Sequence, residues 1–184
     1  HAAEIDKNPA AFCAVELALL DTFATTSGKT VEALLALPEL SGEFQYTGVL
    51  GIKKNTHFQI QFQHYLDMGF RDFKVKIFGE SEIDQANIET IKACGHDSLR
   101  IRLDANNLWS SPSEAIIYIR ELNCPIFAVE EPLDVFSYDD CLELSKQLTA
   151  PIILDESFTQ EMMFQHIEES PASWIINLRV SKMG

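Results

Sequence analysis

Three acidic residues of this chain stand at the ends of short apolar runs that have the length and composition of β-strands. Asp104 ends LRIRLD, Glu130 ends IFAVE and Asp155 follows PIIL, so the carboxylates recur about 25 residues apart. A stretch with helical spacing follows each of them. Oxygen ligands that converge from neighbouring strands suit Mg²⁺. The sequence therefore predicts a Mg²⁺ site formed by Asp104, Glu130 and Asp155.

Two lysines precede these carboxylates by one strand–helix unit. Lys74 and Lys76 lie in FKVKI, and the alternation of side chains along a strand places both on one face. A metal ion beside a lysine base is suited to removing the proton next to a carboxylate, because the metal stabilises the resulting enediolate. The competing interpretation is a solvated K-x-K on an edge strand, and the downstream carboxylates favour the site.

The hydrophobic spacing predicts that strands and helices alternate from Phe44 onward. An initial helix is expected over 9–25 and a short helical turn over 31–35. We divide the chain into a helical linker over 1–43 and a catalytic domain over 44–184. The expected strands cover 44–52, 73–77, 99–104, 126–130, 151–154 and 174–180, and the expected helices follow them at 56–68, 81–95, from 111, 137–148 and 159–168.

This alternation predicts an α/β fold with a parallel sheet wound in right-handed βαβ units. A doubly wound open sheet and a (β/α)8 barrel both satisfy the pattern. The first strand is not followed by G-x-G-x-x-G, and polar residues end several different strands, which favours the barrel. Only about six of the eight units are present, so we expect the chain to be a segment of a longer enzyme.

Composition excludes some partners. The formal net charge is −14, from 28 acidic and 14 basic residues, which argues against binding to nucleic acid or to an anionic membrane surface. The apolar runs are strand-sized, so no membrane-spanning helix is expected. The four cysteines have no C-x-x-C spacing and are predicted to be free thiols of a reducing cytosol, which implies a cytoplasmic protein.

Taken in order, the motifs K-x-K, D-A-N, E-E-P, D-E-S and N-L-R-x-x-K-M-G resemble those of the enolase superfamily. The resemblance is to its muconate-lactonizing (mandelate racemase/muconate cycloisomerase-like) branch, which includes cycloisomerases, o-succinylbenzoate synthases and dipeptide epimerases. Residues 10–35 are also similar to the linker helix that precedes the barrel in that branch.

The resemblance implies a role for each matching residue. Lys76 would take the α-proton of a small-molecule carboxylate substrate, Lys74 would lie beside it, and the three carboxylates would bind Mg²⁺. Asn106 could orient a metal ligand, whereas Glu131 and Glu156 are expected to lie behind the ligands or at the surface. The resemblance also implies a homo-oligomer.

The chain departs from the family pattern at Arg179, where a lysine is usual. Arginine stays protonated near neutral pH and is a poor proton acceptor. We therefore expect Arg179 to act as a fixed cation in a one-base lyase or cycloisomerase, ahead of a dipeptide epimerase or racemase. Lys182 is an alternative to Arg179 at the site. A non-catalytic relative or an inactive fragment is the alternative of another class.

Overall fold

The computed structural model describes residues 7–96 and 98–183. The chain forms two compact units. One combines the segment up to Phe44 with the segment from Leu178 onward, and the other comprises residues 45–177.

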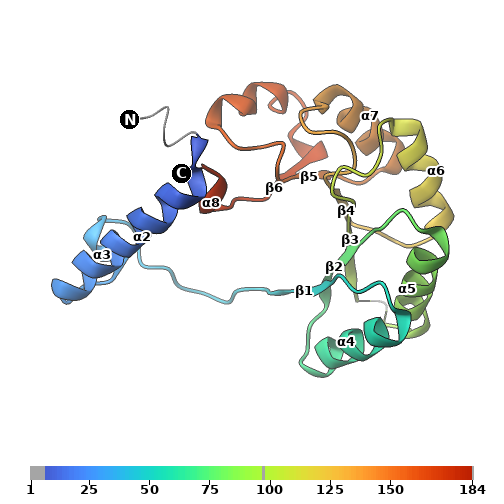
Figure 1. Ribbon diagram of the computed structural model, residues 1–184, viewed down its shortest axis with the longest axis horizontal. Helices are drawn as coiled ribbons and strands as arrows, with labels where there is room; N and C mark the ends of the chain where they lie inside the picture. Colours follow the sequence, from blue (N-terminus) through green and yellow to red (C-terminus); the bar gives the residue numbers. More distant parts are fainter. Residues whose placement is uncertain (1–6, 97, 184) are drawn as a thin grey trace. The chain divides into compact units, whose positions relative to one another are not determined.

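The described residues of the first unit include three helices. They are α2 (Pro9–Thr26), α3 (Val31–Leu34) and α8 (Val180–Met183), and α2 contacts both of the others (Figure 1). Proline at the first position of α2 costs no hydrogen bond, because the first N–H groups of a helix have no partner within it. Thr30 caps α3 by accepting a hydrogen bond from the Ala33 amide at 3.2 Å.

Helix α2 is apolar but largely exposed. Val15, Leu19 and Phe23 have exposed fractions of 61, 53 and 60 %. With 18 residues and a mean hydropathy of 1.2, α2 is long and apolar enough to span a membrane, so the expectation that no helix would reach that length is wrong. Length and composition are weak evidence for a membrane span, because a signal sequence or the core helix of a soluble protein meets the same criterion.

The second unit is built on a parallel sheet. Within the described residues its strands run in the order β1-β2-β3-β4-β5-β6, each beside its predecessor in the chain (Figure 1). A doubly wound sheet reverses its order at a switch point, whereas this sheet winds in one direction, as a (β/α) barrel does. The barrel prediction is therefore confirmed, with six of its strands present. The strands are β1 (Thr47–Leu50), β2 (Asp72–Lys76), β3 (Arg100–Asp104), β4 (Ala128–Glu130), β5 (Ile152–Leu154) and β6 (Trp174–Ile176).

Helices follow the strands as expected, with one exception. Helix α6 begins at Pro112 behind Ser111, whose hydroxyl accepts a hydrogen bond from the Glu114 amide at 3.4 Å. The segment expected as a helix over 159–168 instead forms a short 3-10 helix, η1 (Glu161–His166). Strand β6 ends at Ile176, four residues before the expected end. The remaining elements are α4 (Asn55–Asp67), α5 (Ser81–Ala93), α6 (Pro112–Leu122), α7 (Tyr138–Leu148) and η2 (Pro171–Ser173).

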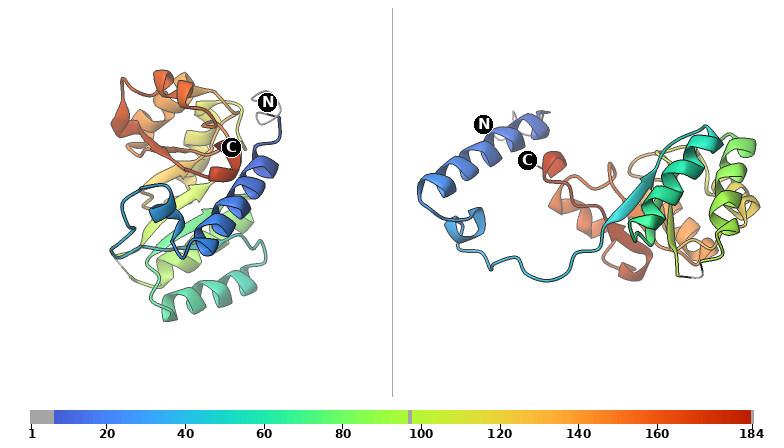
Figure 2. Two further views of the ribbon diagram at one scale, coloured as in Figure 1. Left: turned by 90° about the vertical axis from the view of Figure 1, so that its left-hand side faces the viewer. Right: turned by 90° about the horizontal axis from the view of Figure 1, so that it is seen from below.

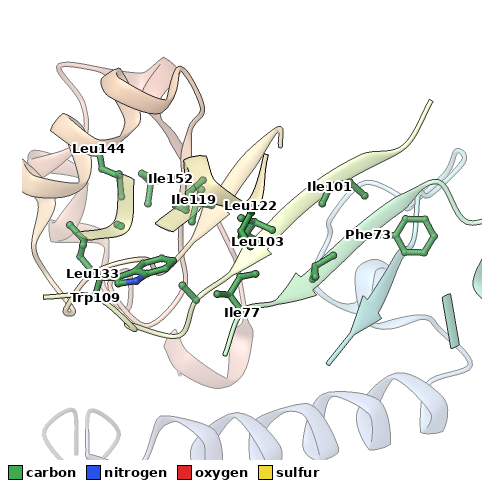
Figure 3. Close-up of a cluster of buried hydrophobic side chains, with 14 of the residues drawn as sticks. Phe73, Ile77, Ile101, Leu103, Trp109, Ile119, Leu122, Leu133, Leu144 and Ile152 are labelled. Carbon is green, nitrogen blue, oxygen red and sulfur yellow. The ribbon is translucent and has the colours of Figure 1, made fainter. Parts of the chain in front are cut away.

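One face of the sheet packs against these helices (Figures 1 and 2). Phe73 is fully buried there, and its ring meets that of Phe62 from α4 edge-on at 5.1 Å. Figure 3 shows this core, in which Ile101 and Leu103 of β3 lie on the same face as Phe73. Each such side chain contributes about 2 kcal/mol by leaving water. Because side chains alternate along a strand, packing these residues against the helices turns their neighbours in sequence to the opposite face.

Candidate active site

The strand register brings the proposed site residues into one row across the sheet. Lys76 of β2 pairs with Asp104 of β3, and Asp104 pairs with Glu130 of β4. Glu130 in turn pairs with Ile153 of β5, and Asp155 follows directly after that strand ends at Leu154. Lys76, Asp104 and Glu130 lie on the face opposite the helix-packed core, and all four residues lie at or just beyond the carboxyl ends of their strands.

Lys74 joins two of the proposed metal ligands. Its ammonium nitrogen lies 2.9 Å from Glu130 Oε1 and 3.0 Å from Asp104 Oδ2. Asn177, which follows β6, donates a hydrogen bond to Glu130 Oε1 at 3.3 Å. The Arg102 Nε lies 3.9 Å from the other oxygen of Glu130. Glu130 is only 2 % exposed, so these groups supply the positive charge and hydrogen bonds that its burial requires.

Lys74 remains protonated in this environment. Burial acts to lower the pKa of Lys74, but its hydrogen bonds to Glu130 and Asp104 and the charge of both carboxylates outweigh that effect. The pKa of Lys74 is therefore raised above its ordinary value. This environment favours the protonated form of Lys74, and Lys76, half-buried two residues further along β2, stays the candidate proton acceptor on the resemblance to the family.

The carboxylates have the chemistry of a Mg²⁺ site. Asp104, Glu130 and Asp155 are 5, 2 and 6 % exposed, and Asp104 Oδ1 is buried without a hydrogen-bond partner. An unpaired buried carboxylate oxygen is costly and suits a cation ligand. Over residues 7–96 and 98–183, however, no three His, Cys, Asp or Glu side chains are grouped closely enough to hold a metal ion. Asp104 and Glu130 converge on the Lys74 ammonium instead.

Behind this row, Glu131 forms a buried network. The sequence placed Glu131 behind the ligands or at the surface but did not reveal its hydrogen-bond partners. Its carboxylate accepts hydrogen bonds from the Asp155 and Ser157 amides, the Ser157 hydroxyl and the Asn107 side chain. Burial raises the pKa of Glu131, and the hydrogen bonds from Ser157 and Asp155 oppose the rise. The E-E-P motif was the available signal for this network. It contains two glutamates, Glu130 and Glu131, so it does not tell which of them faces the metal row and which forms the network. By contrast, Glu156 is exposed.

The D-A-N motif contributes differently from the expectation. Asn106 is exposed, with a positive φ of 47°. The next residue, Asn107, has a φ of 58° and donates from its side chain to Glu131 Oε2 at 3.2 Å and to the Leu133 carbonyl at 2.6 Å. Asparagine tolerates the left-handed region better than most residues, which explains its use in this turn. Asn107, and not Asn106, therefore links the β3 and β4 ends.

A second buried carboxylate fixes the turn that follows Lys76. Asp84, 1 % exposed, accepts hydrogen bonds from the Phe78 and Gly79 amides at 3.0 Å each. The Tyr118 hydroxyl of α6 donates to the same carboxylate at 2.6 Å. Burial together with the charge of Asp84 raises the pKa of Tyr118, so this hydrogen bond persists at neutral pH.

The residues expected at the end of the sixth strand lie in the other unit. Arg179 precedes α8, and Lys182 lies within it. Because β6 ends at Ile176, the alternation of side chains along a strand does not decide whether Arg179 or Lys182 faces the site. Gly184, the last residue of the N-L-R-x-x-K-M-G motif, lies outside the described residues.

A cavity of about 480 Å³ lies elsewhere in the second unit. Phe136, Tyr138 and His166 line it, and the rings of Tyr138 and His166 stack with centroids 4.6 Å apart. It contains none of the row residues. The chemistry of the row, not the presence of this cavity, identifies the candidate site.

The family described as "Enolase C-terminal domain-like" matches residues 57–184. The chain belongs to this family. The order of its strands and its resemblance to the enolase superfamily agree with this membership.

Individual members of the family match nearly the whole chain. It is 31 % identical over 96 % of its length to the L-Ala-D/L-Glu epimerase of Bacillus subtilis. The solved muconate lactonizing enzyme of Pseudomonas putida covers 92 % of the chain with a TM-score of 0.77 and 27 % identity. An enolase from Bradyrhizobium, complexed with magnesium and mandelic acid, covers 95 % of the chain with a TM-score of 0.78 and 22 % identity, which shows the shared fold.

The chain spans about half the length of these relatives. It covers 49 % of the epimerase, 47 % of the muconate lactonizing enzyme and 48 % of the Bradyrhizobium enolase.

Proposed function

We propose that this protein is a Mg²⁺-dependent enzyme that removes the α-proton of a carboxylate substrate, with Lys76 as the base. The row of Lys76, Asp104 and Glu130 across three strands carries the proposal, because it places a lysine beside two buried carboxylates on the open face of the sheet. Lys74 supports it by supplying a fixed cation that binds both carboxylates.

The roles follow from the charges of the site. Asp104, Glu130 and Asp155 would hold the ion, and Mg²⁺, when bound, supplies positive charge beside the developing enediolate. Lys76 in its neutral form accepts the α-proton, and the proton then resides on its side-chain nitrogen. Lys74 keeps its proton throughout and lowers the energy of negative charge that develops next to it.

Deuterium exchange tests the proposal. The intact natural protein is incubated with Mg²⁺ and candidate carboxylates, including dipeptides, in D₂O, and incorporation at the α-carbon is followed by mass spectrometry. We expect Lys76→Ala to slow exchange by about 10³-fold, since general-base catalysis contributes about 10²–10⁴, while Mg²⁺ binding is retained. The exposed lysine of α7 provides the control, Lys146→Ala, which should exchange at the normal rate.

Two outcomes would refute the assignment. Unchanged exchange in Lys76→Ala would exclude that lysine as the base. Absence of Mg²⁺-dependent exchange in the natural protein, with every carboxylate tried, would favour the non-catalytic alternative.

Two reactions fit the proposed chemistry. Arg179, in the position where the family pattern has lysine, favours a one-base lyase or cycloisomerase of the o-succinylbenzoate synthase or muconate cycloisomerase type. The 31 % identity to the L-Ala-D/L-Glu epimerase favours a dipeptide epimerase as the second candidate. The exchange experiment separates them, because an epimerase incorporates deuterium into the inverted stereoisomer, whereas a one-base lyase releases an unsaturated or rearranged product.

The remaining properties follow from the same proposal. The partner is a small carboxylate and not a nucleic acid or a membrane, in keeping with the net charge of −14. The four cysteines are free, as expected for a cytoplasmic protein. A homo-oligomer is proposed by analogy with the family.

A further inference from the structure

Glu131 is a buried carboxylate of the second unit that lies outside the ligand row. It is 2 % exposed, and both of its oxygens are used. Oε1 accepts from the Asp155 amide at 2.5 Å and from the Ser157 amide at 2.8 Å. Oε2 accepts from the Ser157 hydroxyl at 2.7 Å and from the Asn107 side chain at 3.2 Å.

These contacts tie together the ends of three consecutive strands. Asn107 lies three residues beyond Asp104, Glu131 adjoins Glu130, and Ser157 lies two residues beyond Asp155. Each proposed metal ligand is therefore within three residues of Glu131 itself or of a residue that donates a hydrogen bond to Glu131.

The backbone at Glu131 adopts an unfavourable conformation to make these contacts. Its φ is +39°, in the left-handed region that non-glycine residues seldom occupy. This turn lets successive side chains diverge: Glu130 meets Lys74 in the row, while Glu131 reaches the Asp155 and Ser157 amides behind it. Strain of this kind persists only where surrounding contacts compensate for it.

We propose that Glu131 is a positioning residue that fixes the backbone of Asp155 and thereby sets the direction of the Asp155 carboxylate toward the metal. The inference rests on the proposed function, in which Asp155 is a Mg²⁺ ligand. The hydrogen bond from the Asp155 amide restrains the peptide plane from which that side chain extends. Groups behind a metal ligand commonly change metal affinity 10–100-fold when removed.

Two substitutions of Glu131 separate its acceptor role from its bulk. Glu131→Gln keeps a carbonyl oxygen for the Asp155 and Ser157 amides, although its NH₂ group then faces the Asn107 donor. Glu131→Leu keeps similar volume and removes every acceptor. The control is Glu169→Ala, which removes an exposed carboxylate from the same unit.

The experiment measures Mg²⁺ affinity by calorimetry and the exchange rates of the Asp155 and Ser157 amides by NMR, both in the intact natural protein. Glu131→Leu should weaken Mg²⁺ binding by about 10-fold or more and speed exchange at both amides. Glu131→Gln should restore most of the affinity and protection. Glu169→Ala should match the natural protein in both measurements.

A milder variant covers the case in which Glu131→Leu does not fold. Ser157→Ala removes only the hydroxyl hydrogen bond to Oε2 and leaves the Ser157 amide in place. It should weaken Mg²⁺ binding by a few-fold and leave the fold intact. Unchanged affinity in this variant, when Glu131→Leu is unfolded, would overturn the proposal.

The outcomes distinguish this inference from the proposed function. If the natural protein binds Mg²⁺ and folded Glu131→Leu binds it equally well, the positioning role is wrong and the proposed function stands. Weakened binding without faster amide exchange would also overturn it, because the effect would not pass through the Asp155 backbone. If the natural protein binds no Mg²⁺, the proposed function itself fails, and the positioning role falls with it.

Discussion

Lys74 neutralises two buried carboxylates that would otherwise repel each other. Asp104 and Glu130 pair across β3 and β4, and the Lys74 ammonium lies within 3.0 Å of both. Removing one partner of a buried ion pair costs several kcal/mol, because the remaining charge has lost its compensation. This arrangement allows a test of the site that needs no substrate.

Replacing the ammonium by an uncharged side chain should destabilise the metal-free protein. We expect Lys74→Met to lower the free energy of unfolding by about 3 kcal/mol, as measured by urea denaturation in EDTA. Saturating Mg²⁺ should stabilise Lys74→Met more than the natural protein, because a bound cation then compensates both carboxylates. Equal free energies of unfolding for the two proteins in EDTA would show that the ion pairs of Lys74 with Asp104 and Glu130 do not stabilise the fold.

A surface lysine gives the matched control. Lys53 pairs with Glu80, but its side chain is 55 % exposed. Lys53→Met should change the free energy of unfolding by less than about 1 kcal/mol, since exposed ion pairs contribute little.

The thiols of Cys124 and Cys141 should be slow to react. Burial raises the pKa of Cys124 to about 11 and that of Cys141 to about 12, so little thiolate is present near neutral pH. We expect alkylation of both by iodoacetamide at pH 8 to be much slower in the folded protein than in urea, and to accelerate as the pH approaches 11. Mass spectrometry of tryptic peptides measures the rates, and equal folded and unfolded rates would contradict the prediction.

At the scale of elements, Asp84 connects helix α5, the turn after β2 and helix α6. It belongs to the first turn of α5, binds the amides that follow β2 and accepts from Tyr118 of α6. We expect Asp84→Ala to lower the free energy of unfolding by about 3 kcal/mol, because it leaves buried donors unpaired. Chemical denaturation measures the loss.

The same helix turn supplies the control for Asp84. Glu82 is exposed, and its removal takes the same charge from the N-terminus of α5. Glu82→Ala should cost about 0.5 kcal/mol or less. A similar loss in both variants would show that helix electrostatics, and not the buried contacts, explain the effect of Asp84→Ala.

Elements with strong periodicity could be predicted from the sequence. The cap at Ser111-Pro112 located the start of α6, and the alternation in FKVKI placed Lys74 and Lys76 on one face. The prediction of an α-helix over 159–168 was wrong, because a short run with helical spacing does not distinguish an α-helix from the 3-10 helix that forms at Glu161–His166. Strand β6 was extended too far because apolar residues recur past Ile176, at Leu178 and Val180, in alternation with polar ones as in a strand.

Within the candidate site, residue types and spacing identified the row but not its hydrogen bonds. The pairing of Lys74 with Glu130 joins residues far apart in sequence and follows only from the strand register. The roles of Asn107 and Glu131 depend on positive φ values, which the sequence signals only weakly for asparagine and not at all for glutamate. Long-range register and local backbone strain therefore account for what sequence reasoning missed.

For the whole molecule, the sheet has two outer strands. In the part of the chain described, β1 pairs only with β2, and β6 pairs only with β5. Unpaired strand edges are unfavourable and are removed when a barrel closes. Since the chain covers about half of each named relative, we expect the natural gene product to be about twice 184 residues long.

The intact mass of the natural gene product checks this expectation. A mass near twice that of this chain would direct all activity measurements to the longer protein. A product of this same length would mean that another chain completes the sheet, or that the sheet stays open, and the catalytic proposal would be weakened because this chain alone would not close the barrel around the row.

The row of Lys76, Asp104 and Glu130 also limits how the gene can change in length. Inserting one codon within β3 would move Asp104 to the helix-packed face and bring an apolar side chain into the row. A codon inserted into the loops that follow α4, α5 or α6 would leave the parity of every strand unchanged. Insertions and deletions among functional descendants of this gene should therefore occur in those loops, while the number of residues in each strand stays constant.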